Sequence, residues 1–216
     1  MRRSLLYSFL LLILILSALL LTATVFRGYK LANQISVSYF NNATVRTRSE
    51  ISSITTPILN ALHQTKRSFE TGLLDVNDTE NLNRYFLPIM EQIPYLNSIN
   101  TGDEEGNGYL FLKNEDIWQN RIVNPGKWGS KKTKWLKFSQ NLQLLEENMQ
   151  DIGYDPRVRP WYKNAINSKD ITAPAWTKPY IFHTTKEPGI TVSIRNFLPN
   201  KQSFVLAFDM KSKDLT

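Results

Sequence analysis

The segment Asp151-Ile-Gly-Tyr-Asp-Pro-Arg-Val-Arg-Pro-Trp-Tyr162 places two arginines, three aromatic residues and two prolines within nine positions, 154–162. The prolines stiffen the backbone, and the guanidinium groups offer forked donors that suit a carboxylate. Tryptophan and tyrosine can wall a pocket while their N–H and O–H groups donate hydrogen bonds. The same residues could instead form a packed corner, with an arginine stacked on Trp161 and paired with Asp155. The segment alone leaves both interpretations open.

The sequence on either side of this segment predicts short strands separated by turns. Glycine, aspartate and asparagine punctuate the runs, and Ile190, Val192 and Ile194 alternate so that they share one face. Between the strands, Arg157–Ile166 suits a short helix with Pro160 in its first turn. The expected strands are Tyr95–Asn100, Tyr109–Lys113, Trp118–Val123, Thr133–Phe138, Ala175–Phe182, Ile190–Phe197 and Ser203–Met210.

Helices are predicted before the strands. Residues 28–70 have apolar positions at three- and four-residue spacing, and Pro57 should kink that helix or begin a second one. A second helix is expected over Thr79–Gln92, capped by Asp78 or Thr79 and stopped by Pro94. The apolar stripe of the first helix comprises Leu31, Ile35, Tyr39, Ile51, Ile54, Ile58, Leu59 and Leu62. The fold class is therefore α+β: a long N-terminal helix followed by an antiparallel sheet with one inserted helix.

A membrane anchor is predicted at the N-terminus. Leu5–Phe26 is uncharged and long enough to span a hydrocarbon core of about 30 Å. A cleaved signal peptide usually has a shorter apolar region of about 7–15 residues, so an uncleaved signal anchor is favoured. The arginines at 2 and 3 favour a cytoplasmic N-terminus. The expected organisation is a cytoplasmic tip at 1–4, a transmembrane helix at 5–26 and an extracytoplasmic domain at 27–216.

Composition and motifs argue against several other classes of protein. The chain has a net charge of +7 but scattered basic residues, and its one cluster, Lys131-Lys132-Thr-Lys134, is interpreted as a solvated strand edge rather than a nucleic-acid site. Without cysteine there is no thiolate metal site, and the acidic run 103–105 lacks the spacing of a calcium loop. His63 and His183 are interpreted as ordinary surface or interface residues, with a ligand contact or a pH-sensitive group as the open alternative. No enzyme motif is present, so neither catalysis nor a cofactor or metal is expected.

The chain resembles the double Cache (dCache) family, the PAS-like extracytoplasmic sensors of bacterial chemoreceptors, sensor kinases and diguanylate cyclases. The residues that carry this resemblance are Tyr154-Asp-Pro-Arg-Val-Arg159-Pro-Trp161-Tyr162, Trp176-Thr-Lys-Pro-Tyr180, Pro188-Gly-Ile-Thr-Val-Ser193 and the final-strand Asp209. The resemblance implies a ligand-binding module in the bacterial inner membrane, with its sensor domain in the periplasm or outside the cell. Residues 27–216 would form the membrane-distal part of a longer sensor domain, because a second subdomain, a return span and a cytoplasmic output are missing before Thr216.

A subset of that family binds free amino acids, and the resemblance implies a matching site here. Its ligand-binding residues would be Tyr154, Arg159, Trp161, Tyr162, Tyr180 and Asp209. Arg159 and Trp161 would hold the ligand carboxylate, and Asp209 with the tyrosines would receive the ammonium. The sequence departs from the family after Tyr180, where some members have a further acidic residue and this chain has Ile-Phe-His. The expected partners are an amino acid or related amine or carboxylate, the membrane, and a second copy through the stalk helix. The alternative is a non-sensing fragment that dimerises with a full-length receptor.

Overall fold

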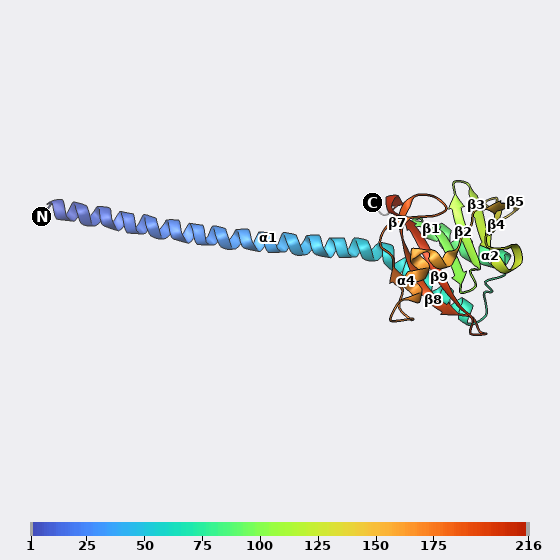
Figure 1. The fold of residues 1–216 in the computed structure, drawn as a ribbon. Coiled ribbons are helices and arrows are strands. Elements are labelled where there is room, and N and C mark those ends of the chain that lie inside the picture. Colours follow the sequence, from blue (N-terminus) through green and yellow to red (C-terminus); the bar gives the residue numbers. More distant parts are fainter. Residues whose placement is uncertain (1, 215–216) are drawn as a thin grey trace. The chain divides into compact units, whose positions relative to one another are not determined.

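The computed structural model describes the backbone of residues 2–214 and the side chains of residues 9–30 and 44–213 (Figure 1). The chain divides into two compact units, residues 1–53 and 54–216. The first unit is helical throughout its described part, and the second contains the sheet and the remaining helices. The two units are therefore considered separately.

Helix α1 (Arg2–Glu70) supplies the whole described part of the first unit and ends in the second. Its segment Phe9–Lys30 is long and apolar enough to cross a membrane, and its side chains are exposed. That segment overlaps the predicted anchor at 5–26. Pro57 lies inside the helix and begins no second one, which removes one of the two expectations for that residue. The stripe positions 31, 35 and 39 lie outside the described side chains.

One antiparallel sheet organises the second unit. Its strands follow the order β5-β4-β3-β2-β1-β9-β8-β6, and the short β7 also pairs with β8. The first and last long strands of the chain thus lie side by side at its centre. The strands are β1 (Leu96–Asp103), β2 (Gly108–Asn114), β3 (Ile117–Val123), β4 (Lys132–Phe138), β5 (Leu144–Asp151), β6 (Ala175–Trp176), β7 (Tyr180–Ile181), β8 (Pro188–Phe197) and β9 (Ser203–Lys211).

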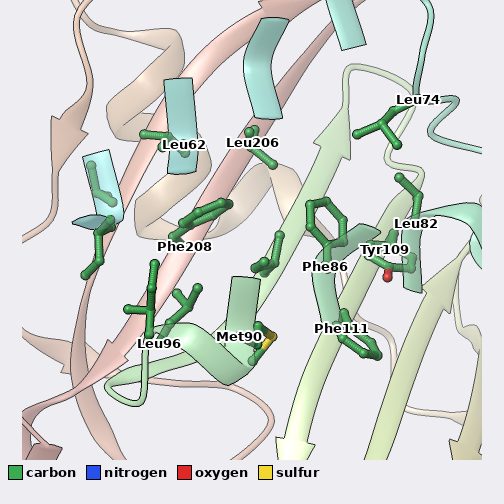
Figure 2. Packing of buried hydrophobic residues seen from close by; sticks show 14 of the residues in the cluster. Leu62, Leu74, Leu82, Phe86, Met90, Leu96, Tyr109, Phe111, Leu206 and Phe208 are labelled. Atoms are coloured by element: carbon green, nitrogen blue, oxygen red, sulfur yellow. The ribbon is translucent and has the colours of Figure 1, made fainter. Parts of the chain in front are cut away.

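The two faces of the sheet pack against different helices. One face packs against the end of α1 and against α2 (Thr79–Gln92), forming the main core shown in Figure 2 around Leu62, Phe86 and Phe208. The other face carries α4 (Pro160–Ile166), which packs on Val205 and Ala207 of β9 (Figure 1). Alternation along a strand sends successive side chains to opposite faces, so β9 serves both layers. The short helices α3 (Pro125–Trp128), η1 (Pro156–Val158) and η2 (Ser212–Asp214) complete the fold.

A buried amide pair joins α2 to the sheet. Asn83 of α2 and Asn120 of β3 exchange two hydrogen bonds of 2.8 Å each through their side-chain amides. The Tyr109 hydroxyl of β2 donates to the Asn83 oxygen at 2.7 Å. Burial raises the pKa of Tyr109 well above its ordinary value, so it stays a hydroxyl donor. The pair fixes where α2 lies on the core face.

Most predicted elements are confirmed. Helix α2 has the predicted bounds, and the Asp78 carboxylate caps it by accepting from the Asn81 amide at 3.1 Å. The α+β class with a PAS-like sheet is also confirmed. Strand β5 was not predicted, and this overturns the interpretation of the lysine cluster, because β5 pairs with β4 and removes it from the edge. Lys131 and Lys132 of the cluster are exposed, whereas Lys134 is half-buried and pairs with Glu147 of β5 at 2.5 Å.

Replacing Asn83 by alanine should destabilise the second unit by about 2–4 kcal/mol, because the Asn120 amide and the Tyr109 hydroxyl would each lose a buried partner. Urea denaturation of the purified full chain in detergent measures the effect. The matched control is Arg84→Ala on the same helix, where an exposed ion pair with Glu80 contributes little. An Asn83→Ala midpoint equal to that of the control would contradict the structural role of the pair.

Candidate functional site

A small cavity lies on the face of the sheet that carries α4. Its volume is about 20 Å³, room for one water molecule. Its walls come from β1, β2, β3 and β9, from the segment before α4, from Trp161 of α4 and from the segment around β7. The lining residues are Asn97, Ser98, Asn100, Leu110, Leu112, Arg121, Tyr154, Arg159, Trp161, Tyr180, Phe182, His183, Thr184, Thr185 and Asp209.

The arginine-aromatic segment enters the cavity wall from one side. The Asp155 carboxylate accepts from the Arg157 amide at 2.9 Å and starts η1, and Pro160 opens α4 as its first residue. A Cβ at Gly102 of β1 would lie 2.7 Å from Pro156, so only glycine lets this segment approach the sheet so closely.

The two arginines of that segment do different things. Arg157 is exposed, pairs with Asp155 at 2.8 Å and donates to the Glu104 carbonyl at 3.2 Å. Arg159 lines the cavity with its guanidinium carbon 4.7 Å from the centre of the Tyr154 ring. The packed-corner interpretation thus describes Arg157, and the pocket interpretation describes Arg159. The arginine that stacks does so on Tyr154 rather than on Trp161.

Asp209 is the acidic residue of the cavity lining. Its side chain is buried in β9 and accepts from Ser98 and Asn100 of β1, both at 2.7 Å, and from Thr191 of β8 at 2.5 Å. Burial raises the pKa of the carboxyl, and the three hydrogen bonds oppose that rise. The Thr191 hydroxyl also contacts that of Tyr180 at 2.8 Å. The carboxylate therefore faces the cavity with most of its acceptor capacity already used by neutral groups.

Arg121 is a second cation in the lining. It projects from β3, is 3 % exposed, and its guanidinium carbon lies 3.5 Å from the centre of the Tyr154 ring. The Thr184 hydroxyl accepts a hydrogen bond from its Nη1. Burial lowers the pKa of Arg121, while Tyr154 and Asp209 raise it. An arginine stays charged in proteins, so two guanidinium groups share the Tyr154 ring as a cation–π surface.

A bulge in β1 turns Asn97 toward the cavity. The pairing of β1 with β9 shifts between Leu96 and Ser98, so Asn97 has no partner across the strands. Asn97 and Ser98 are consecutive, yet both line the cavity, whereas regular alternation would send one of them to the core. The side-chain oxygen of Asn97 is buried and has no hydrogen-bond partner among the described residues.

The segment 180–185 covers the cavity. A Cβ at Gly189 of β8 would lie 2.3 Å from the Phe182 ring, so this glycine lets Phe182 lie flat against the strand. His183 is half-buried and meets Tyr154 edge-to-face at 5.0 Å. Burial, followed by the charges of Arg159, Arg121 and Lys186, lowers the pKa of His183 to about 4. His183 is therefore neutral at physiological pH.

Five of the six residues expected to bind ligand line this one cavity: Tyr154, Arg159, Trp161, Tyr180 and Asp209. Tyr162 does not. It lies in α4, in the buried layer that packs this helix on Val205 and Ala207 of β9. Burial, followed by the charges of Glu104 and Asp103, raises its pKa. His183 lines the cavity, so of the interpretations open for it the ligand contact is favoured over an ordinary surface residue. Arg121 and Asn97 gave no local signal, because pairing across strands, not a motif, brings them to the site.

A wider groove of about 670 Å³ runs between the 103–108 turn and the segment 123–128. Its most buried carboxylate, Asp103, already accepts from the amides of Glu105 and Asn107. None of the buried side-chain atoms that lack a partner in the described residues belongs to the groove. The small cavity contains three of the seven such atoms: Arg121 Nε, Arg159 Nε and Asn97 Oδ1. Polar groups left open in this way mark the small cavity as the candidate site.

Solved structures of bacterial sensory domains share this architecture. The ligand-binding domain of the Campylobacter jejuni chemoreceptor Tlp3 with L-valine has a TM-score of 0.52 at 16% identity, over 78% of this chain and 57% of that one. That of the Pseudomonas aeruginosa amino acid chemoreceptor PctC with GABA has a TM-score of 0.51 at 20% identity, over 82% and 62%. This chain therefore has the fold of these ligand-binding domains.

A third solved domain is similar in fold, whereas the sequence comparisons match little of the chain. The ligand-binding domain of Pseudomonas fluorescens CtaA with L-alanine has a TM-score of 0.50 at 20% identity, over 82% of this chain and 60% of that one. No protein-family model matches the sequence. A stretch of 55 residues, 26% of the chain, is 42% identical to Adenylate cyclase 1 of Rhizobium meliloti and spans 8% of it. The chain thus spans between half and two thirds of the similar solved domains, and a small part of that curated protein.

His183→Gln should remove part of the acid sensitivity of the second unit. The neutral ring is favoured in the folded state, so its contribution to stability is complete above about pH 6.5 and is lost as pH falls toward about 4. Melting temperatures of the purified chain between pH 7 and pH 4 should fall more steeply for the wild type than for the variant. Parallel curves for the two proteins would contradict the buried, neutral state of His183. His63→Gln on α1 is the matched control.

Proposed function

We propose that the chain is the ligand-binding part of a bacterial transmembrane receptor and that its cavity takes an amino acid or a related small amine or carboxylate. The observation that carries this is the meeting of Arg159 and Asp209, fifty residues apart in sequence, in one cavity with unpartnered donors and an unpartnered acceptor. A zwitterion needs a fixed cation and a fixed anion, both shielded from water. Arg159 with Trp161 would hold the carboxylate, and Asp209, Tyr154 and Tyr180 would receive the ammonium.

The likeness to known sensors supports the same proposal. The similar domains of Tlp3, CtaA and PctC were solved with L-valine, L-alanine and GABA, each an amine and a carboxylate on one small molecule. Their shared fold supports a ligand site on the same kind of sheet in this chain. A non-sensing fragment would have no use for buried guanidinium atoms without partners, so that alternative is not favoured. The match to a protein named a cyclase leaves the absence of enzymatic activity a prediction.

Binding would require the cover of the cavity to move. The present volume of about 20 Å³ admits one water and no amino acid. The segment 180–185 contributes five of the lining residues. It pairs with β8 through β7, and two further backbone hydrogen bonds close its turn, Phe182 N to Glu187 O at 2.9 Å and Lys186 N to Phe182 O at 3.1 Å. A ligand that binds the open form more tightly would shift the population toward it.

The anchor and the assembly belong to the same proposal. Phe9–Lys30 would hold the chain in the bacterial inner membrane, with residues 27–216 outside the cytoplasm as the membrane-distal part of a larger sensor domain. A second copy would pair through α1, whose described side chains from 44 to 53 are exposed. The output of the whole receptor would then be chemotaxis, a kinase or a nucleotide cyclase.

Amino acids at millimolar concentration should raise the melting temperature of the purified full chain, because a ligand that binds only the folded state stabilises it by mass action. Arg159→Gln should abolish the rise by removing the guanidinium, and Asp209→Asn should abolish it for ligands with an amine. Differential scanning fluorimetry in detergent, across amino acids, amines and carboxylates, measures the response.

Arg157→Gln is the matched control, since that arginine lies two positions from Arg159, is exposed and stays outside the cavity. It should keep the full response. Circular dichroism of the unliganded variants separates loss of binding from loss of fold. A wild-type chain that no compound stabilises, or an Arg159→Gln chain that responds fully, would refute the proposal.

A further inference from the structure

Arg121 is the feature of the cavity that a simple zwitterion site does not use. It comes from β3, the fourth strand from β8 across the sheet, whereas Asp209 and its donors come from β9, β1 and β8. Register brings it in: Asn100 faces Leu110 across β1 and β2, and Leu110 faces Arg121 across β2 and β3. Its place in the wall is thus set by the sheet itself and does not depend on a loop.

The cation is buried without an ion-pair partner. None of the ion pairs among the described residues includes Arg121 or Arg159. The Nε of each is buried and makes no hydrogen bond to a described residue. Asp209 could have neutralised one of them, but its oxygens accept from Ser98, Asn100 and Thr191 instead. A buried charge without a partner is costly, and such groups occur where a ligand supplies the partner.

The charges of the lining do not match a neutral amino acid. Two guanidinium groups face one carboxylate, and His183 is neutral, so the lining carries one net positive charge. The residues after Tyr180 add no acid to the lining, to which Phe182 and His183 belong. A zwitterion leaves the excess charge in place. A zwitterion with one more carboxylate cancels it.

We propose that the ligand is an acidic amino acid, whose α-carboxylate meets Arg159 and whose side-chain carboxylate meets Arg121. This rests on the proposed function and names the substrate class of the same site. Each guanidinium would use its unpartnered Nε in a charge-assisted bond. The ammonium would lie between Asp209 and the open Asn97 oxygen that the β1 bulge aims at the cavity. Every unpartnered buried atom of the lining would then gain a partner.

Isothermal titration of the purified full chain with two isosteric pairs tests the assignment. L-glutamate should bind at least about ten-fold more tightly than L-glutamine, and L-aspartate than L-asparagine, since only the charge of the side-chain group differs. Which of the two acids binds more tightly depends on how far its side-chain carboxylate reaches toward Arg121. A preference for either acid over its amide supports the assignment. Succinate, which has two carboxylates and no amine, should bind more weakly than the preferred acid.

Arg121→Met keeps most of the side-chain bulk and should remove the preference of the acid over its amide while leaving part of the binding. Arg195→Met, a half-buried arginine of β8 outside the cavity, is the matched control and should keep the preference. The ligand pairs are measured on the wild type, so the assignment stays testable even if Arg121→Met does not fold.

Equal affinity for each acid and its amide, or binding of L-valine or L-alanine without binding of either acid, would overturn the assignment while leaving the proposed function standing. Succinate as tight as the preferred acid would also overturn it, because the amine would then play no part. If no amino acid binds at all, the proposed function fails first.

Discussion

The buried carboxylate of Asp209 is the interaction on which the arrangement of the site depends. It joins β9 to β1 through Ser98 and Asn100, and to β8 through Thr191. One side chain thus ties these three adjacent strands together on the cavity face of the sheet. Breaking such a cluster would leave several buried polar groups without partners, each costing about 1–3 kcal/mol. Replacing any one member would therefore leave its partners without a hydrogen bond at the floor of the cavity, beside Tyr180 and the two arginines.

The same strand also links the cavity to the opposite layer. Asp209 faces the cavity, whereas its neighbours Phe208 and Met210 lie in the core that Ile58 and Leu62 of α1 help to form (Figure 2). A shift of β9 at the floor of the cavity would thus be felt by the last turns of α1 without any intermediate element. Close-packed interiors transmit small displacements in this way, because side chains have few empty volumes to absorb them.

The sequence was sufficient for the elements with strong periodicity and for the residues carried by a motif. Asp78 and Pro94 bounded α2, and alternation placed Val192 and Ile194 in the core. It failed at β5, whose side chains are nearly all exposed, so no alternation between a buried and a solvent face is present in its sequence. It also missed Arg121 and Asn97. Their role arises from register and from a bulge, both set by pairing between strands distant in sequence, and no local pattern encodes them. Tyr162 shows the converse. Its position in a motif predicted a ligand contact, but its position on α4 directs the side chain into the layer that packs the helix on the sheet.

The cavity is smaller than the ligand proposed for it. The unpartnered polar atoms of its lining explain why it can still be a ligand site. Two stacked guanidiniums on Tyr154 fill the space while leaving Nε of each unbonded, so the closed form is packed but electrostatically incomplete. Such a form has a reason to open: a ligand carboxylate satisfies donors that protein groups leave unpaired, and this differential affinity favours the open state. A cavity that was fully satisfied when closed would have no such bias. The closed form is in turn held by the pairing of β7 with β8 and by the side-chain hydrogen bonds of Tyr180 and Thr184. A ligand opens the cavity only if its bonds to the two arginines outweigh these contacts.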